Sequence, residues 1–194
     1  RLRRALLERE CVLREERVSA NEWRRRRGYG LLPDLSNYQF ADHVRPMVLL
    51  SLNTGLRQGE VFSLTWDRVE GGFITVNATN AKSRRSRHVP LNREAANTLD
   101  GWRHQVEPVG LVFRGRDGKF DNVRKAWGRL LLEAEIHDFT WHDMRHHFAS
   151  RLVMKGIPLN TVRELLGHAD LQTTMRYAHL APQHLREAVE VLDE

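Results

Sequence analysis

The stretch that decides the fold runs from Thr140 to Tyr177 and reads TWHDMRHHFASRLVMKGIPLNTVRELLGHADLQTTMRY. Residues that begin and end helices divide it into helical segments. Thr140, with Asp143 three residues on, has the spacing of a capping box, so we predict a helix that begins one residue before His142. Gly156-Ile157-Pro158 ends this helix and opens the next one. Because the connections are very short, the segments should pack against one another.

The second and third helices of this stretch also have defined ends. Gly167 closes the second helix, so His168 lies at its exit, and Asp170 or a neighbouring residue opens the third. A helical count places Tyr177 roughly 110° from the centre of the inward stripe of the third helix. We therefore expect Tyr177 to have a role other than filling the core. The predicted inward stripe consists of Leu171, Thr174, Met175 and Ala178.

The first helix carries two polar candidates beside an apolar arc. The same count places His142 and Arg145 along the edge of the arc, and side chains at an edge line pockets rather than fill cores. The arc itself consists of Trp141, Met144, Phe148 and Leu152.

Composition limits the class of protein. The 194 residues suffice for one sizeable core, and 31 Lys and Arg against 25 acidic residues give a formal charge of +6. This balance suits a polyanionic partner, although a basic soluble protein without one explains it equally well. The single cysteine, Cys11, excludes an internal disulfide and a multi-cysteine zinc module. No apolar run approaches the ~20 residues of a membrane span, so we expect a cytoplasmic protein with no membrane partner.

The N-terminal part differs from the rest of the chain. Residues 1–27 contain no Gly or Pro and mix acidic with basic side chains, which predicts one long helix, and residues 28–36 read as a loop. We expect residues 1–35 to form a helical extension and residues 36–194 to form the compact domain. A helix from Asp42 is apolar on nearly every face, which indicates burial, and it ends at Asn53-Thr54-Gly55. Arg57 follows at the start of a further short helix.

The fold class predicted from these patterns is α+β and mainly α. Two short β-like runs, residues 73–76 and 87–91, flank a polar basic turn with Lys82 near its start, which predicts a small antiparallel sheet beside a helical bundle. A short strand or extended piece is expected at residues 111–113. Further helices are predicted at residues 92–105, 121–135 and 182–192.

The polar candidates match the needs of phosphodiester cleavage without a metal. Guanidinium groups stabilise the charge on phosphate oxygens through paired hydrogen bonds, and Arg57 and Arg145 lie on well-anchored helical elements. Tyr177 is a nucleophile once its proton is removed. Lys82 or a histidine can act as the acid, and His142 or His168 can orient or deprotonate. The chemistry requires neither ATP nor Mg²⁺.

Five motifs in order resemble the catalytic domain of tyrosine recombinases of the phage integrase family. They cover roughly residues 42–180, and all five in order are far more specific than any one of them. They are Thr54-Gly55-Leu56-Arg57-Gln58-Gly59-Glu60, the Ala81-Lys82 turn ending in Val89-Pro90-Leu91, His142-Asp143-Met144-Arg145-His146, Leu165-Leu166-Gly167-His168, and Tyr177 nine residues further on.

The resemblance implies a fold, an activity and a role for each matching residue. It implies a tyrosine recombinase catalytic-domain fold and an integrase that cleaves and rejoins double-stranded DNA at specific sites through a 3′-phosphotyrosyl link, with no cofactor. It also implies a homotetramer on DNA, with a monomer when free as the alternative. The implied catalytic residues are Arg57 and Arg145 on the phosphate, Lys82 as acid to the 5′ oxygen, His142 in proton transfer, His168 on the phosphate and Tyr177 as nucleophile.

Other residues support this site in the same interpretation. Glu60 is expected to support the first arginine, and Arg84, Arg85 and Arg87 are candidates for contacts to the DNA backbone. Arg84 or Arg85 is also an alternative to Lys82. Family members normally carry a separate N-terminal core-binding domain, for which we expect no room in 194 residues, so the chain is expected to be either a fragment or one that uses residues 1–35 in another way.

Simpler interpretations and two rival functions remain open at this point. Arg57 and Arg145 alone would suit salt bridges, His168 a helix cap, and Tyr177 a buried ring. A zinc site at His142 and His146, four residues apart, lacks an evident third ligand. The rival functions are a type IB topoisomerase-like relaxing enzyme and a non-catalytic helix-turn-helix-like DNA-binding module.

Overall fold

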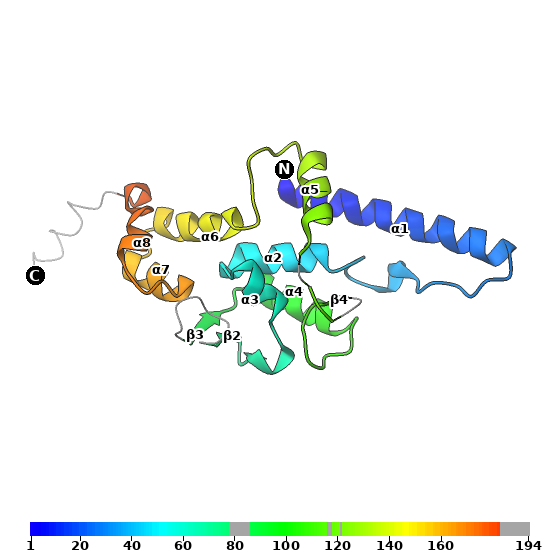
Figure 1. Ribbon diagram of the computed structural model, residues 1–194, viewed down its shortest axis with the longest axis horizontal. Helices are drawn as coiled ribbons and strands as arrows, with labels where there is room; N and C mark the ends of the chain where they lie inside the picture. The colour runs from blue at the N-terminus through cyan, green and yellow to red at the C-terminus, as the bar shows by residue number, and fades with distance from the viewer. Residues whose placement is uncertain (78–85, 116–117, 121, 183–194) are drawn as a thin grey trace, which may run out of the picture.

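The computed structural model describes residues 1–77, 86–115, 118–120 and 122–182 (Figure 1). Its helices and strands follow the predicted order and confirm a mainly helical fold with small antiparallel sheets. The helices are α1 (Leu2–Arg26), α2 (Val44–Thr54), α3 (Gln58–Phe62), α4 (Arg93–Arg103), α5 (Arg124–Glu133), α6 (Asp143–Met154), α7 (Leu159–Leu166) and α8 (Gln172–Met175). The strands are β1 (Val69–Glu70), β2 (Phe73–Val76), β3 (Arg87–Pro90), β4 (Arg114–Gly115) and β5 (Gly118–Lys119). Three 3₁₀ turns are η1 (Leu35–Asn37), η2 (Trp66–Arg68) and η3 (Ala178–Leu180).

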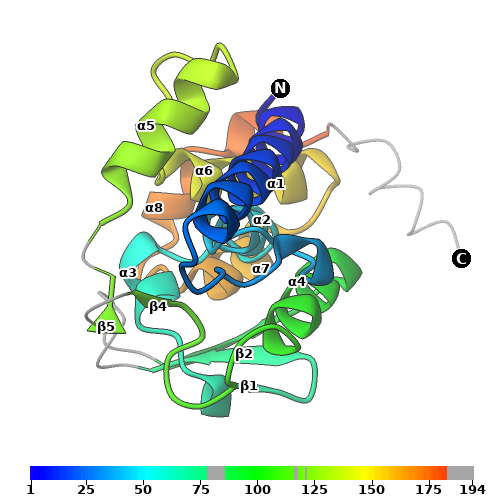
Figure 2. The same cartoon turned by 90° about the vertical axis from the view of Figure 1, so that its right-hand side faces the viewer.

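Helix α2 lies at the centre of the main core, as its apolar sequence predicts. It packs against α4 and α6, and the end-on view shows other helices on several sides of it (Figure 2). Met47, Val48 and Leu50 have no exposed surface, and Val44 has 2%. A helix buried on nearly all faces is rigid, so the residues that follow its C-terminus are held in place.

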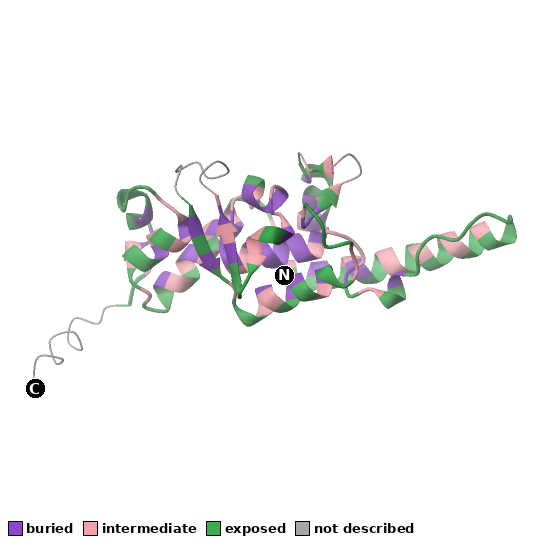
Figure 3. Ribbon diagram, turned by 90° about the horizontal axis from the view of Figure 1, so that it is seen from below, coloured by how far each residue is buried: buried purple, intermediate pink, exposed green. Residues whose placement is uncertain are grey.

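Helix α1 is buried at its beginning and projects at its end. Ala5 and Leu6 are 2% and 1% exposed and belong to the main core, whereas exposed residues dominate the distal half (Figure 3). Buried Glu10 accepts hydrogen bonds from the backbone N–H of Ala41 at 3.1 Å and from Arg45 at 2.5 Å. The first turns of α1 are therefore part of the compact fold, and the division of the chain after residue 35 stays a prediction.

The main sheet has the order β1-β2-β3 with antiparallel pairs throughout. In its register Ile74 is opposite Val89, and Val76 is opposite Arg87. Side chains alternate along β3, so Arg87 and Val89 are buried while His88 is exposed. The pleat therefore turns Arg87 toward the interior. The short strand β1 was not predicted, and the expected strand at residues 111–113 contributes only a bridge between Leu111 and Thr65.

The three C-terminal helices build a second, smaller core. Its buried members come from α6, α7 and the end of α8: Ala149, Val153, Val162, Leu166 and Tyr177. The first turn of α6 belongs instead to the main core through Trp141 and Met144. Helix α6 thus joins the two cores, and the predicted functional residues of α6 lie near the junction.

Two details of this region differ from the prediction. Helix α6 begins at Asp143, two residues later than expected, because the preceding turn closes with i to i+3 hydrogen bonds, such as the one from the Asp143 N–H to the Thr140 carbonyl at 3.1 Å. The expected capping contact is present, since the Asp143 carboxylate accepts the backbone N–H and the hydroxyl of Thr140, both at 2.6 Å. The predicted inward stripe of the third helix is right for Thr174 and wrong for Leu171 and Met175. Leu171 and Met175 are 41% and 45% exposed, whereas Thr174 is fully buried.

The cause is that α8 ends after one turn and continues with i to i+3 hydrogen bonds. The Tyr177 N–H donates to the Thr174 carbonyl at 3.0 Å, and η3 follows. With three residues per turn, residues i and i+3 share a face, so Tyr177 lies inward together with Thr174. The segment predicted as a last helix, residues 182–192, lies outside the described residues apart from residue 182.

A pair of adjacent leucines tests whether α1 belongs to the core. We expect Leu6→Ala to lower the free energy of unfolding by about 2–5 kcal/mol, because it leaves a cavity in a packed core. Leu7→Ala is the matched control, since Leu7 is 50% exposed and surface changes usually stay within about 0.5 kcal/mol. Urea unfolding measures both. Equal stability of the two variants would contradict the placement of α1.

Candidate active site

Arg145 lies at the junction of the two cores and connects two helix ends. Its side chain is buried, and its guanidinium donates to the carbonyl of Gly55 at 2.7 Å and to the carbonyl of Leu166 at 2.5 Å. These carbonyls belong to the C-terminal ends of α2 and α7, where helices lack internal donors and carry partial negative charge. Arg145 is thus buried more deeply than its expected position at the edge of the apolar arc suggests, and the two carbonyls compensate this burial.

Glycines make both helix ends possible. Gly55 and Gly167 have φ of +63° and +64°, which favours glycine. A Cβ on Gly55 would lie 2.5 Å from Phe148, and one on Gly167 would lie 2.7 Å from the Cδ of Arg87. The glycines therefore let α6 and β3 approach the two helix ends closely.

Glu60 holds two further arginines in place. Its carboxylate accepts the backbone N–H of Arg57 at 2.8 Å and the Arg57 guanidinium at 3.0 Å. It also accepts two hydrogen bonds from Arg87, at 3.0 and 2.7 Å. Arg87 in addition donates to the carbonyl of Leu165 at 3.0 Å, again at the end of α7.

Arg87 has a different environment from the one that a contact to the DNA backbone would require. It is only 8% exposed and its guanidinium is occupied by Glu60 and by the end of α7. Through these hydrogen bonds Arg87 connects β3 to α3 and α7. Arg57 is more accessible, with 23% of its side chain exposed.

The arginines are close enough to influence one another strongly. Burial and the positive charges of Arg57 and Arg87 lower the pKa of Arg145 to about 9. It remains a cation at neutral pH. Burial by itself would raise the pKa of Glu60, but its bonds and charge interactions with Arg87 and Arg57 lower it overall. Two guanidinium groups pair with the one carboxylate of Glu60, and Arg145 adds a third positive charge nearby, which leaves a surplus of positive charge at this point.

His168 lies beside the cationic cluster. Burial and the charges of Arg145 and Arg57 lower its pKa to about 4, so the imidazole is neutral at pH 7. Its Nδ1 is 2.9 Å from the hydroxyl of the buried Thr174. With Nδ1 engaged by this hydroxyl, Nε2 is the nitrogen left to contact a ligand.

Tyr177 is buried in the second core, and its hydroxyl contacts a histidine that the sequence did not assign to this chemistry. The phenol oxygen is 2.5 Å from the Nδ1 of His146, and the two rings are 5.9 Å apart between centroids. Burial raises the pKa of Tyr177 although Arg176 and Arg145 act in the other direction. Tyr177 therefore lies within the electrostatic reach of Arg145.

His142 is the most accessible member of the group. Its ring packs edge to face against His146, with centroids 4.9 Å apart. Burial and the charges of His146, Arg145 and Arg57 lower its pKa. Within the described part of the chain, no three His, Cys, Asp or Glu side chains come together as a metal site would need.

The structure thus brings together five of the six predicted catalytic residues together with Glu60. The five are Arg57, His142, Arg145, His168 and Tyr177. Lys82, Arg84 and Arg85 lie outside the described residues, so their placement stays a prediction.

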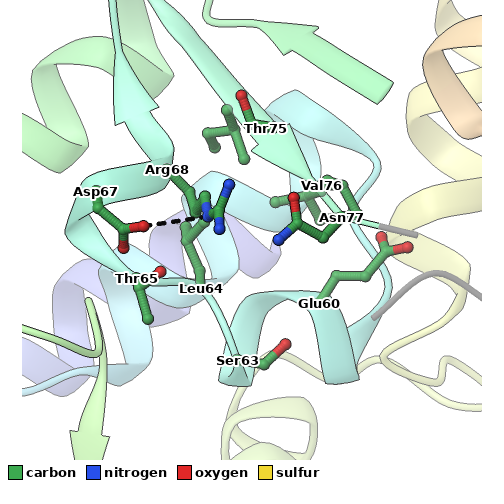
Figure 4. Close-up of a pocket in the computed structure, with 11 residues that line it drawn as sticks. Glu60, Ser63, Leu64, Thr65, Asp67, Arg68, Thr75, Val76 and Asn77 are labelled. Atoms are coloured by element: carbon green, nitrogen blue, oxygen red, sulfur yellow. Dashed lines mark ion pairs between the residues drawn. The ribbon is translucent and has the colours of Figure 1, made fainter. Parts of the chain in front are cut away.

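A groove beside the cluster gives a ligand access to it. The groove has a volume of about 500 Å³, lies between β3 and α7, and is lined at one side by Arg87, Gly167 and His168. A separate polar pocket of about 310 Å³ lies between α3 and β2, with Glu60 at its edge and Arg68 and Asn77 reaching into it (Figure 4). The predicted catalytic residue His168 lines the groove and does not line this second pocket, so the groove is the better candidate for substrate.

A model of the phage integrase family matches residues 33–184, which is most of the chain and includes the whole cluster. The chain belongs to the phage integrase family. Among known family members, the integrase of Salmonella phage P22 is 31% identical over 164 residues, covering 77% of this chain and 42% of that protein. The integrase of Haemophilus phage HP1 is 35% identical, and the match covers 83% of this chain and 44% of that protein. The tyrosine recombinase XerC of Azotobacter vinelandii is 35% identical, and the match covers 72% of this chain and 48% of that protein.

Solved structures of this integrase family confirm the fold. The catalytic domain of bacteriophage HP1 integrase superposes with a TM-score of 0.63 at 32% identity, over 80% of this chain and 84% of that one. XerH recombinase in a post-cleavage complex with its difH substrate superposes with a TM-score of 0.59 at 26% identity, over 77% of this chain and 46% of that one. The chain spans less than half the length of the two phage integrases it matches, so it corresponds to their catalytic portion. Among the described residues no helix has the length and apolar character needed to cross a membrane.

Replacing Glu60 tests the charge balance of this integrase-family site. Because the folded-state pKa of Glu60 lies below its ordinary value of 4.5, the carboxylate stabilises the fold above that pH, and the stabilisation is lost as pH falls through the folded pKa. We expect Glu60→Gln to lower the free energy of unfolding at pH 7 by about 3 kcal/mol, as expected for a broken buried ion pair. The variant should also lose less stability than the wild type on acidification.

Urea unfolding at a series of pH values from 7 downward measures both effects. Glu15→Gln is the control, because Glu15 is exposed and the described residues provide it with no ion pair. Parallel pH profiles for wild type and Glu60→Gln would show that Glu60 does not hold the arginines in the way described.

Proposed function

We propose that this chain is the catalytic domain of a site-specific DNA recombinase that cleaves and rejoins strands through a 3′-phosphotyrosyl intermediate. The observation that carries the proposal is the buried, doubly anchored Arg145 beside Arg57, with Tyr177 within its electrostatic reach. A surplus of guanidinium charge in a partly buried site favours an anion, and preorganised donors stabilise the charge that grows on phosphate oxygens during the reaction. Covalent attachment to a tyrosine conserves the bond for religation.

Each residue of the cluster has a role in this proposal that suits its environment. Arg57 and Arg145 bind the non-bridging oxygens of the phosphate. The Nε2 of His168 is available for a third hydrogen bond, since Thr174 occupies the other nitrogen. Tyr177 attacks phosphorus, His142 assists proton transfer near the solvent, and Lys82 is the acid for the 5′ oxygen.

The proposed partner is double-stranded DNA, bound as a homotetramer during strand exchange in the bacterial cytoplasm. Two observations support DNA as the partner: the net charge of +6, and the bound substrate of the related XerH structure. The groove between β3 and α7 leads past Arg87 to His168 and offers a path for the DNA backbone to the cluster. Neither Mg²⁺ nor ATP has a step in this reaction.

Two other functions fit the observations less well. A non-catalytic helix-turn-helix module would leave Tyr177 and the arginine cluster without a role. A type IB topoisomerase-like enzyme shares the chemistry and differs in that it needs no specific site and no tetramer. Relaxation of plasmids irrespective of sequence, without recombination, would favour that alternative.

Trapping the covalent adduct tests the role of Tyr177. The substrate is a pool of nicked duplexes with randomised cores, because cleavage next to a nick releases a short fragment and prevents religation. We expect the wild type to form a detergent-resistant protein–DNA adduct and Tyr177→Phe to form none, because the phenylalanine lacks the attacking oxygen. Tyr29→Phe is the matched control and should retain the wild-type yield, since Tyr29 is 54% exposed on the far side of α1. An adduct that persists in Tyr177→Phe would contradict the proposal.

Removal of metal ions tests the catalytic mechanism. We expect the yield and rate of adduct formation to be unchanged in an excess of EDTA at constant ionic strength, because guanidinium groups supply the charge that a metal would provide. The same reaction with added Mg²⁺ or Zn²⁺ after chelation is the control. Loss of adduct with EDTA and its recovery with one of these ions would show that the metal-free mechanism is wrong.

A further inference from the structure

His146 is the only residue of the described cluster that forms a hydrogen bond with the hydroxyl of Tyr177. It stands in the third sequence motif, yet none of the roles proposed above is assigned to it. Its Nδ1 is 2.5 Å from the phenol oxygen, which is the distance of a direct hydrogen bond. The contact joins α6 to the segment after α8, 31 residues apart along the chain. A contact to the reacting atom is what a base in this reaction needs.

We propose that His146 is the base of the reaction: its Nδ1 accepts the phenol proton of Tyr177 during strand cleavage and returns that proton during religation. This inference rests on the proposed function, since it concerns the same nucleophile. It replaces the sequence-based expectation that His142 or His168 deprotonates Tyr177.

The geometry favours His146 over the other two histidines. The Nδ1 of His168 is engaged by the hydroxyl of Thr174, and the described contacts of His168 include no hydrogen bond to the hydroxyl of Tyr177. His142 packs its ring against the ring of His146, and the described contacts of Tyr177 include no hydrogen bond to it. His142 is therefore one ring further from the reacting oxygen.

The proton balance of cleavage can be written with this assignment. The O–H bond of Tyr177 breaks as its oxygen forms a bond to phosphorus, and the proton moves to Nδ1 of His146. The bond from phosphorus to the 5′ oxygen breaks, and the leaving oxygen takes a proton from the acid, for which the sequence offers Lys82. The imidazolium of His146 then passes its Nε2 proton to water or toward the exposed ring of His142. Religation reverses each step.

The charges around His146 keep its proton affinity low until a substrate phosphate binds. Burial and the charges of Arg176 and Arg145 lower its pKa, while the carboxylate of Asp143 acts in the opposite direction. The resting imidazole is therefore neutral and free to accept a proton. An incoming phosphate adds negative charge beside Arg145, which raises the affinity of His146 for a proton. The groups that face His146 are His142, Asp143 and Arg145 from α6, and Arg176 and Tyr177 from the end of α8.

Two substitutions separate proton transfer from simple positioning. In His146→Asn the side-chain oxygen occupies nearly the position of Nδ1 and can accept the hydrogen bond, but an amide cannot take the proton. His146→Ala removes both functions and leaves space for an added imidazole. His147→Asn is the control, because this neighbouring histidine is exposed and the charges that act on it are those of Arg151 and Arg3.

The readout is the single-turnover rate of adduct formation on a nicked duplex that the wild type cleaves. We expect His146→Ala and His146→Asn to be slower by about 10²–10⁴-fold, the usual contribution of a positioned base. Added imidazole should raise the rate of adduct formation at least tenfold in His146→Ala and should leave the rate of the His147→Asn control unchanged. The wild-type rate should reach a plateau once His146 is neutral, whereas both variants should continue to gain rate as pH rises, because hydroxide must then remove the proton.

Each outcome has a distinct meaning. A wild-type rate in His146→Asn would overturn the proposal, because a group that cannot accept a proton would suffice. Slow variants that imidazole does not restore and that keep the wild-type pH profile would also overturn it. Thermal unfolding of each variant excludes loss of the fold as the cause. Failure of the wild type to form any adduct would instead contradict the proposed function itself.

Discussion

The structure depends on one buried guanidinium that connects two helix ends. Arg145 donates to the carbonyls of Gly55 and Leu166, at the C-termini of α2 and α7, and its backbone lies on α6. These helices belong to two different hydrophobic cores, so the same two hydrogen bonds hold the cores together. Removing a partner from a buried charge costs several kcal/mol, which makes this junction the least replaceable contact of the domain.

The junction also explains why the site is electrostatically strained without a ligand. Glu60 pairs with Arg57 and Arg87, whereas Arg145 is held by backbone carbonyls, so positive charge is in surplus. Burial and this surplus charge lower the pKa of His168 to about 4. Burial of like charges opposes folding, and the helix ends and Glu60 compensate only part of it. An anion in the site supplies the missing negative charge. The fold therefore carries an electrostatic cost that the phosphate of the proposed DNA substrate would relieve, and such costs are common at functional sites.

Local patterns predicted most of the elements, and the errors arose where tertiary contacts outweigh them. The inward position of Arg87 follows from the period of two that it shares with the buried Val89, and this signal was available in the sequence. The burial of Arg145 was not predictable, since its acceptors are carbonyls on distant helices. Tyr177 was misplaced because a helical period was applied across a 3₁₀ turn. Its contact with His146 depends on how the segment after α8 lies against α6, which no local pattern specifies.

Helix α6 sets the geometry of both partners in the proposed reaction. Arg145 and His146 are neighbours in sequence, and successive side chains of a helix point about 100° apart. One of them therefore faces the phosphate site and the other faces the nucleophile. Because α6 is fixed at one end in the main core and at the other in the second core, the distance between these two groups is set by backbone geometry. A reaction that needs the phosphate and the attacking oxygen close together gains most from such rigid placement, since preorganisation removes the entropic cost of aligning them.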